Sequence, residues 1–76
     1  MDIGKHDVAL IYRDGAEALY VDGHLIHAAR RISKEDLLYF LQFIANYKYS
    51  SFYYENDFDV FPEELDEIRD SLHRRA

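Results

Sequence analysis

Hydrophobic and polar positions alternate over the first third of the chain in the way that short β-strands require. Apolar and β-branched residues fill 8–12, 17–21 and 24–28, and Asp-Gly pairs at Asp14 and Asp22 separate these segments. Asp-Gly favours tight hairpins because both residues tolerate positive φ values. The pattern predicts a three-stranded antiparallel meander. Since 8–12 is apolar on both faces, we expect it at the centre of the sheet or under a helix.

The periodicity changes after the third predicted strand, and a helix is predicted over 34–47. Ser33 and Asp36 have the spacing of a capping box, and Ile32 and Leu37 can form a hydrophobic staple across the helix start. On a helical wheel the apolar arc is wider than one small sheet can bury. The excess is expected to be buried by the C-terminal segment or by another chain. The residues assigned to self-association are Tyr39, Phe43 and Tyr47.

The segment 48–61 is predicted to be ordered because it is unusually aromatic. Seven of the twelve aromatic residues lie between Tyr47 and Phe61, which makes this stretch too apolar for an open linker. As an alternative to irregular structure, residues 51–54 would add a fourth strand to the sheet. We expect its phenylalanines, Phe52, Phe58 and Phe61, to fold over the apolar face of the helix, because a small domain needs its large side chains for the core.

A second helix is predicted over 62–75. Pro62 suits the first helical position, acidic residues follow in the first turn, and basic residues come near the end, in agreement with the helix dipole. Helical spacing places one apolar stripe opposite the acidic positions. The stripe consists of Phe61, Leu65, Ile68 and Leu72. The predicted fold class is therefore α+β: a three-stranded antiparallel meander, or a four-stranded one, with a packed central helix and a C-terminal amphipathic acidic helix in a single small domain, 1–76.

Charge is concentrated in the C-terminal third. The chain has 76 residues and a net charge of −6, and eight acidic residues but one basic residue lie between Glu55 and Asp70. A solvated helix face would show the same pattern. The alternative is an electronegative surface that recognises a basic site, with nearby tyrosines supplying contact area. The residues assigned to partner binding are Tyr49, Tyr53, Tyr54, Glu55, Asp57, Asp59, Glu63, Asp66, Glu67 and Asp70.

Two functional classes follow from these patterns. The first is a non-enzymatic inhibitor or adaptor whose tyrosine and carboxylate surface occupies a basic, nucleic-acid-binding site on a partner protein. Small acidic proteins that phages and mobile elements use against host defence are an analogy for this class. The second is a self-associating structural or regulatory subunit, a homodimer that uses the wide apolar face of helix 34–47.

Catalytic and metal chemistry have little support in the sequence. There is no Cys, no phosphate-binding glycine loop and no metalloprotease motif. Glu55, Asp57 and Asp59 alternate as calcium ligands do, but Val60 stands where the calcium loop requires Gly. His24 and His27 are expected on opposite faces of a strand. We therefore expect no enzyme activity, no metal and no cofactor.

Nucleic acid and membranes are not expected as direct partners. Clustered basic residues are few and stand in a net negative field, which disfavours binding to a phosphate backbone. No apolar run reaches the roughly 18 to 20 residues of a membrane span. The first seven residues lack the basic and apolar regions of a signal peptide, so the expected location is the cytoplasm.

Overall fold

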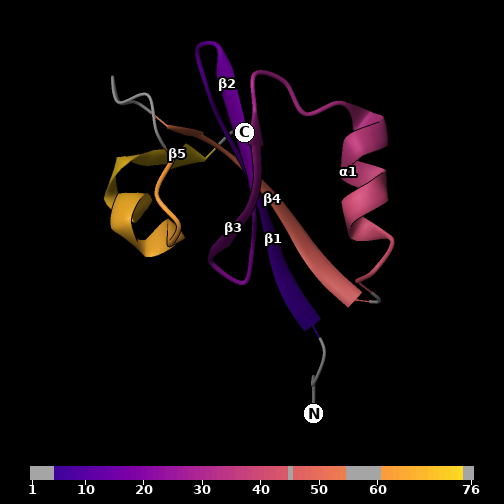
Figure 1. The fold of residues 1–76 in the computed structure, drawn as a ribbon. Helices are drawn as coiled ribbons and strands as arrows, with labels where there is room; N and C mark the ends of the chain where they lie inside the picture. Colours follow the sequence, from indigo (N-terminus) through magenta and orange to yellow (C-terminus); the bar gives the residue numbers. More distant parts are fainter. Residues whose placement is uncertain (1–4, 45, 55–60, 75–76) are drawn as a thin grey trace.

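The computed structural model describes residues 5–44, 46–54 and 61–74 and shows a small mixed α+β fold with a five-stranded sheet and two helices (Figure 1). The strand order is β3-β2-β1-β4-β5. The strands are β1 (Lys5–Arg13), β2 (Ala16–Val21), β3 (His24–Ala29), β4 (Asn46–Tyr54) and β5 (Leu72–Arg74). The helices are α1 (Lys34–Leu41) and the 3-10 helix η1 (Leu65–Ser71). Neither helix is long and apolar enough to cross a membrane.

The predicted meander forms β1, β2 and β3. Both connections are Asp-Gly turns in which backbone φ is positive, at 80° for Gly15, 53° for Asp22 and 83° for Gly23. Antiparallel ladders join β1 to β2 and β2 to β3. The prediction that the first strand is central is confirmed, because β1 has β2 on one side and β4 on the other.

The helix predicted over 34–47 ends at Leu41, and its last part belongs to a strand instead. Residues 46–54 form β4, which pairs in parallel with β1 from Lys5↔Asn46 to Tyr12↔Tyr53. The fourth strand predicted at 51–54 was therefore too short, and it does not continue the antiparallel meander. The connection through α1 carries the chain across β2 and β1, so that β4 enters parallel to β1 and satisfies the backbone groups on its open side.

The helix predicted over 62–75 is present only over 65–71, and it is a 3-10 helix and not an α-helix. β5 follows it and pairs antiparallel with the end of β4, with Leu72 opposite Tyr54. At the other end of η1, the Leu25 N–H donates to the Glu63 carbonyl at 2.8 Å, and the Leu65 N–H donates to the Gly23 carbonyl at 2.7 Å. Sheet hydrogen bonds at both ends limit the helical segment to the residues between them.

The sheet separates two hydrophobic clusters, one under α1 and one under the C-terminal segment (Figure 1). The α1 cluster is built on Val8, Leu19 and Ile32. The cluster on the opposite face contains Ala9, Ile11, Ala18, Tyr20, Tyr54, Phe61, Leu65 and Ile68. Of the predicted stripe, Phe61, Leu65 and Ile68 are buried and Leu72 is partly buried beside them. Phe52 and Phe61, however, pack on the face opposite α1 and not over the helix. Phe58 lies outside the described residues.

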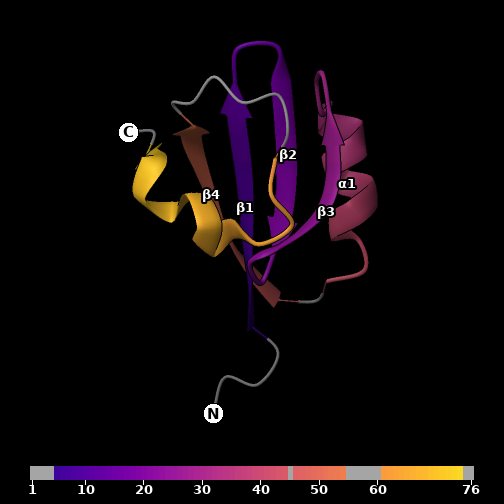
Figure 2. The same ribbon diagram turned by 60° about the vertical axis from the view of Figure 1, so that its left-hand side comes forward.

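The start of α1 agrees with the sequence. The Asp36 N–H donates to Ser33 Oγ at 3.1 Å, and the Ser33 N–H donates to Asp36 Oδ2 at 3.4 Å, so the predicted capping box is confirmed. Glu17 of β2 accepts a hydrogen bond from the Ile32 N–H at 2.6 Å, which ties the chain just before the helix to the sheet. Phe40 contacts His27 of β3, with ring centroids 4.9 Å apart. The helix therefore covers the β3 side of the sheet, as Figure 2 shows.

Candidate functional site

The tyrosines assigned to partner binding do not lie on one face of β4. Side chains alternate along a strand, and Phe52 and Tyr54 pack into the cluster opposite α1. Tyr54 is only 3% exposed, so it belongs to the core and is not available to a partner. Tyr49 and Tyr53 point to the α1 face, where Tyr53 contacts Tyr12 with ring centroids 5.5 Å apart.

The acidic residues assigned to partner binding lie on the other side of the molecule. Leu65 and Ile68 are buried against the sheet, so the positions between and after them face solvent. We define the acidic surface as the exposed carboxylates of this segment: Glu63, Glu64, Asp66, Glu67 and Asp70. The other predicted members, Glu55, Asp57 and Asp59, lie outside the described residues.

The predicted combination of tyrosines and carboxylates is thus divided by the sheet. Tyr49 pairs with Val8 of the α1 cluster and Tyr53 alternates with it, so both lie on the α1 face. The acidic surface lies on η1 and the residues just before it, on the opposite face of the sheet. Figure 1 shows α1 and η1 on opposite sides of the sheet. No partner surface of ordinary size can cover both at once without wrapping around an edge of the sheet. The two groups must be considered as separate surfaces.

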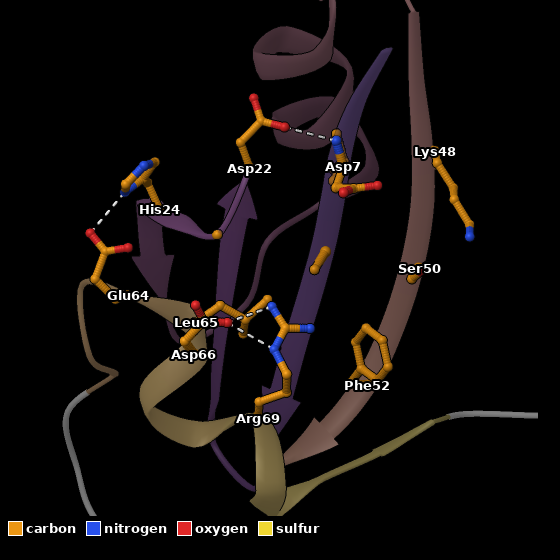
Figure 3. Close-up of a pocket in the computed structure, with 13 residues that line it drawn as sticks. Asp7, Asp22, His24, Lys48, Ser50, Phe52, Glu64, Leu65, Asp66 and Arg69 are labelled. Carbon is orange, nitrogen blue, oxygen red and sulfur yellow. Dashed lines mark hydrogen bonds and ion pairs between the residues drawn. The ribbon is translucent and has the colours of Figure 1, made fainter. Parts of the chain in front are cut away.

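A polar pocket of about 450 Å³ lies beside the acidic surface (Figure 3). Its floor is formed by β1 and β4, and its walls by the turn between β2 and β3 and by the start of η1. Four carboxylates and three basic side chains line it, together with the Phe52 ring. The carboxylates are Asp7, Asp22, Glu64 and Asp66, and the basic residues are His24, Lys48 and Arg69.

Ion pairs already occupy most of these carboxylates. His24 Nδ1 lies 2.8 Å from Glu64 Oε1, and Arg69 donates to Asp66 Oδ1 at 2.8 Å (Figure 3). The hydrogen bond from the backbone N–H of Asp7, followed by the contact with His6, lowers the pKa of Asp22 below its ordinary value. The carboxylate of Asp7 makes no hydrogen bond or ion pair within the described part of the chain.

This arrangement can accept a basic group. Residues 5–44, 46–54 and 61–74 contain no group of three or more His, Asp or Glu that could hold a metal ion. Among them there is also no fully buried charged side chain. The pocket is therefore an open, charged depression, in which Asp7 offers a negative partner and Phe52 an aromatic ring to an incoming Lys or Arg.

The residues assigned to self-association are exposed, as a contact role requires. Phe43 is 75% exposed, Tyr39 is 59% and Tyr47 is 41% exposed. Tyr39 of α1 contacts Phe43, which lies just after the helix, with ring centroids 5.9 Å apart. Leu38 of α1 is exposed as well.

The pocket itself was not predicted. Asp7 and Lys48 stand in register on neighbouring strands, and Asp22, in the turn between β2 and β3, accepts a hydrogen bond from the Asp7 N–H. Each of these residues is an ordinary polar position in the sequence. Their proximity follows from the parallel pairing of β1 with β4, which no local signal indicates.

Comparisons with known proteins identify no relative of this chain: no family model, no curated protein and no solved structure matches it.

Proposed function

We propose that this protein is a non-enzymatic, cytoplasmic binding module whose acidic surface occupies a basic site on a partner protein, such as a site that otherwise binds nucleic acid. The observation that carries the proposal is the outward projection of five carboxylates from one short segment, Glu63 to Asp70, next to a pocket that four carboxylates line. Only Arg69 opposes them in that segment, and it is paired with Asp66.

The geometry of the segment supports this function. Burial of Leu65 and Ile68 fixes η1 on the sheet, and hydrogen bonds to the β2–β3 turn fix its start. The carboxylates are thus displayed on a supported element, which reduces the entropy lost on binding. Complementary charge would speed the encounter with a basic partner and would make binding sensitive to salt.

The pocket supplies a more specific contact. A basic side chain of the partner could enter between the β2–β3 turn and β4, where the Asp7 carboxylate forms no ion pair within the described part of the chain and Phe52 forms part of the lining. Asp7→Asn would keep the backbone hydrogen bonds of Asp7 and remove its charge. We expect this variant to fold normally and to bind the partner less tightly.

The experiment is affinity capture with matched charge reversals. The test variant is Glu63→Lys/Glu67→Lys, and the control is Asp14→Lys/Glu35→Lys, which changes the net charge equally at exposed positions away from η1. Each protein is immobilised and exposed to lysate of the organism that encodes it, at low and high salt. We expect wild type and control to retain a nucleic-acid-binding protein that high salt or added duplex DNA releases, and the test variant to lose it. Equal retention by both double variants, or retention of nothing, would rule out the proposal.

A second candidate function is self-association, which the exposure of Tyr39, Phe43 and Tyr47 favours specifically. Large exposed apolar side chains that lie together often mark a contact surface, and Tyr39 and Phe43 contact each other. Sedimentation equilibrium over a wide range of protein concentration tests this function directly. A mass that stays at that of one chain at every concentration would exclude it.

A further inference from the structure

Two thirds of the outer edge of β4 has no neighbouring strand in the described part of the chain. β4 pairs with β1 along almost its whole length, but on its other side β5 reaches only Phe52, Tyr53 and Tyr54. Over residues 46–51 this side receives no strand and no backbone hydrogen bond from the described part of the chain. Unpaired N–H and C=O groups in an extended strand are a template for another strand.

The opposite edge of the sheet is protected by contrast. The ladder between β2 and β3 is irregular next to Leu19 and Tyr20, which disturbs the edge strand β3. The chain also covers part of that edge itself, through hydrogen bonds that Glu63 and Leu65 form with the start of β3 and with the turn before it. Irregular pairing and covering segments are two usual means of preventing strand addition. By contrast, β4 pairs with β1 in a continuous register, and no described segment covers the outer side of residues 46–51.

The open edge also suits a second copy of this acidic chain. Residues 46–51 include no carboxylate, no Pro and one charge, that of Lys48. Tyr47 and Tyr49 flank the edge on the α1 face, where they are 41% and 44% exposed. A copy that approached the acidic surface would meet strong repulsion, whereas here it would meet hydroxyl, amide and aromatic groups.

We propose that two copies join by antiparallel addition of β4 to β4, across a two-fold axis through Tyr49. This inference deepens the self-association function and rests on it. An axis perpendicular to the sheet keeps both α1 layers on the same side, so a residue can oppose only residues of its own face. Centred on Tyr49, the register covers 47–51: Tyr49 faces its own copy, Lys48 faces Ser50, and Tyr47 faces Ser51.

Neighbouring registers are worse for physical reasons. A centre on Lys48 places two like charges directly opposite each other. A centre on Ser50 shortens the ladder, because Phe52 is already paired with β5. The register on Tyr49 stops just before β5 and brings four tyrosines together on the α1 face, within the range of cross-strand and diagonal aromatic contacts.

The self-opposition of Tyr49 permits a charge-swap test. Tyr49→Lys and Tyr49→Glu each place like charges across the axis, so each variant alone should have a dimer dissociation constant at least about tenfold weaker than wild type. An equimolar mixture places opposite charges there, so it should form heterodimers. Sedimentation equilibrium gives the masses, native mass spectrometry identifies the heterodimer, and circular dichroism checks that each variant folds. Phe43→Ser, just after the end of α1, tests the rival contact through the helix. Ile26→Ser, at an exposed position on β3 at the other edge of the sheet, is the control and should dimerise like wild type.

The outcomes separate this inference from the function beneath it. A wild type that is monomeric at every concentration overturns both. A dimer that Phe43→Ser disrupts and the Tyr49 variants leave intact overturns the β4 register and keeps self-association through the helix. Dimers lost in both Tyr49 variants and restored in their mixture establish the two-fold contact at Tyr49.

Discussion

Asp22 and Asp7 hold each other by a reciprocal pair of hydrogen bonds. The Asp22 N–H donates to the Asp7 carbonyl at 2.7 Å, and the Asp7 N–H donates to the Asp22 carboxylate at 3.0 Å. His6 Nδ1 lies 2.6 Å from the other carboxylate oxygen. The turn between β2 and β3, where Asp22 has a positive φ, is thereby fixed against the start of β1. The same turn forms one wall of the pocket.

The lowered pKa of Asp22 predicts a pH dependence of stability. Because the folded-state pKa lies below the ordinary value of 3.8, the folded state binds fewer protons near that pH than the unfolded state does. The contribution of Asp22 to the free energy of unfolding is complete above pH 3.8 and is lost as the pH falls through the folded-state pKa of Asp22. We expect Asp22→Asn to unfold at lower denaturant concentration than wild type at neutral pH, and the difference to shrink in acid. A difference that does not change from pH 7 to pH 2 would contradict the assignment.

Tyr20 gives a second prediction. Its side chain is buried, its hydroxyl donates to the Pro62 carbonyl at 2.5 Å, and burial, more than the nearby Tyr54 and Glu67, raises its pKa to about 12. Tyr20→Phe removes the donor and leaves the carbonyl without it, which should lower the free energy of unfolding by about 1 to 2 kcal/mol. Urea unfolding at neutral pH measures this difference.

The sign of the alkaline effect follows from the same group. Between the ordinary pKa of 10 and the folded-state value of about 12, unfolded Tyr20 is ionised while folded Tyr20 keeps its proton. Stability from this group is therefore complete below pH 10 and is lost as the pH rises toward 12. Wild type should lose more stability over this range than Tyr20→Phe, and parallel pH profiles for the two proteins would show that the proton is not held as described.

The attachment of η1 to the sheet predicts a contrast between neighbouring positions. Ile68→Ala removes a buried side chain from the cluster opposite α1 and should cost about 2 to 5 kcal/mol. Asp70→Ala, two residues away and exposed, should change stability by no more than about 0.5 kcal/mol. Chemical denaturation of both variants tests the orientation of the segment. Similar losses at the two positions would mean that the acidic surface is not the solvent side.

The capping box of α1 predicts a smaller effect. Ser33→Ala removes the acceptor for the Asp36 N–H and should cost about 1 kcal/mol, within the usual range for cap residues. Lys34→Ala, at the next position and exposed, serves as the matched control and should be nearly neutral. An unchanged midpoint for Ser33→Ala in thermal unfolding would show that tertiary contacts alone hold the helix start.

The parts of this protein that the sequence by itself determined are those set by neighbouring residues. Asp14 and Asp22, each followed by Gly, specify the turns of the meander, because few residue pairs accept positive φ at such positions. Ser33 and Asp36 specify where α1 begins, because their side chains satisfy the first free N–H groups. The burial of Leu65 and Ile68 could also be predicted from the sequence, because α and 3-10 helices both place residues three apart near the same side of the helix.

Only the tertiary structure decided where α1 ends, what the last residues form and which side chains share a surface. Tyr47 fits an apolar helical stripe as well as a strand, and the open side of β1 settles the choice because its backbone groups need partners. Leu72 becomes part of a strand because β4 offers it a ladder. The separation of Tyr49 from the acidic surface follows from the two faces of that sheet. Such pairings join residues far apart in the chain, and local periodicity carries no information about them.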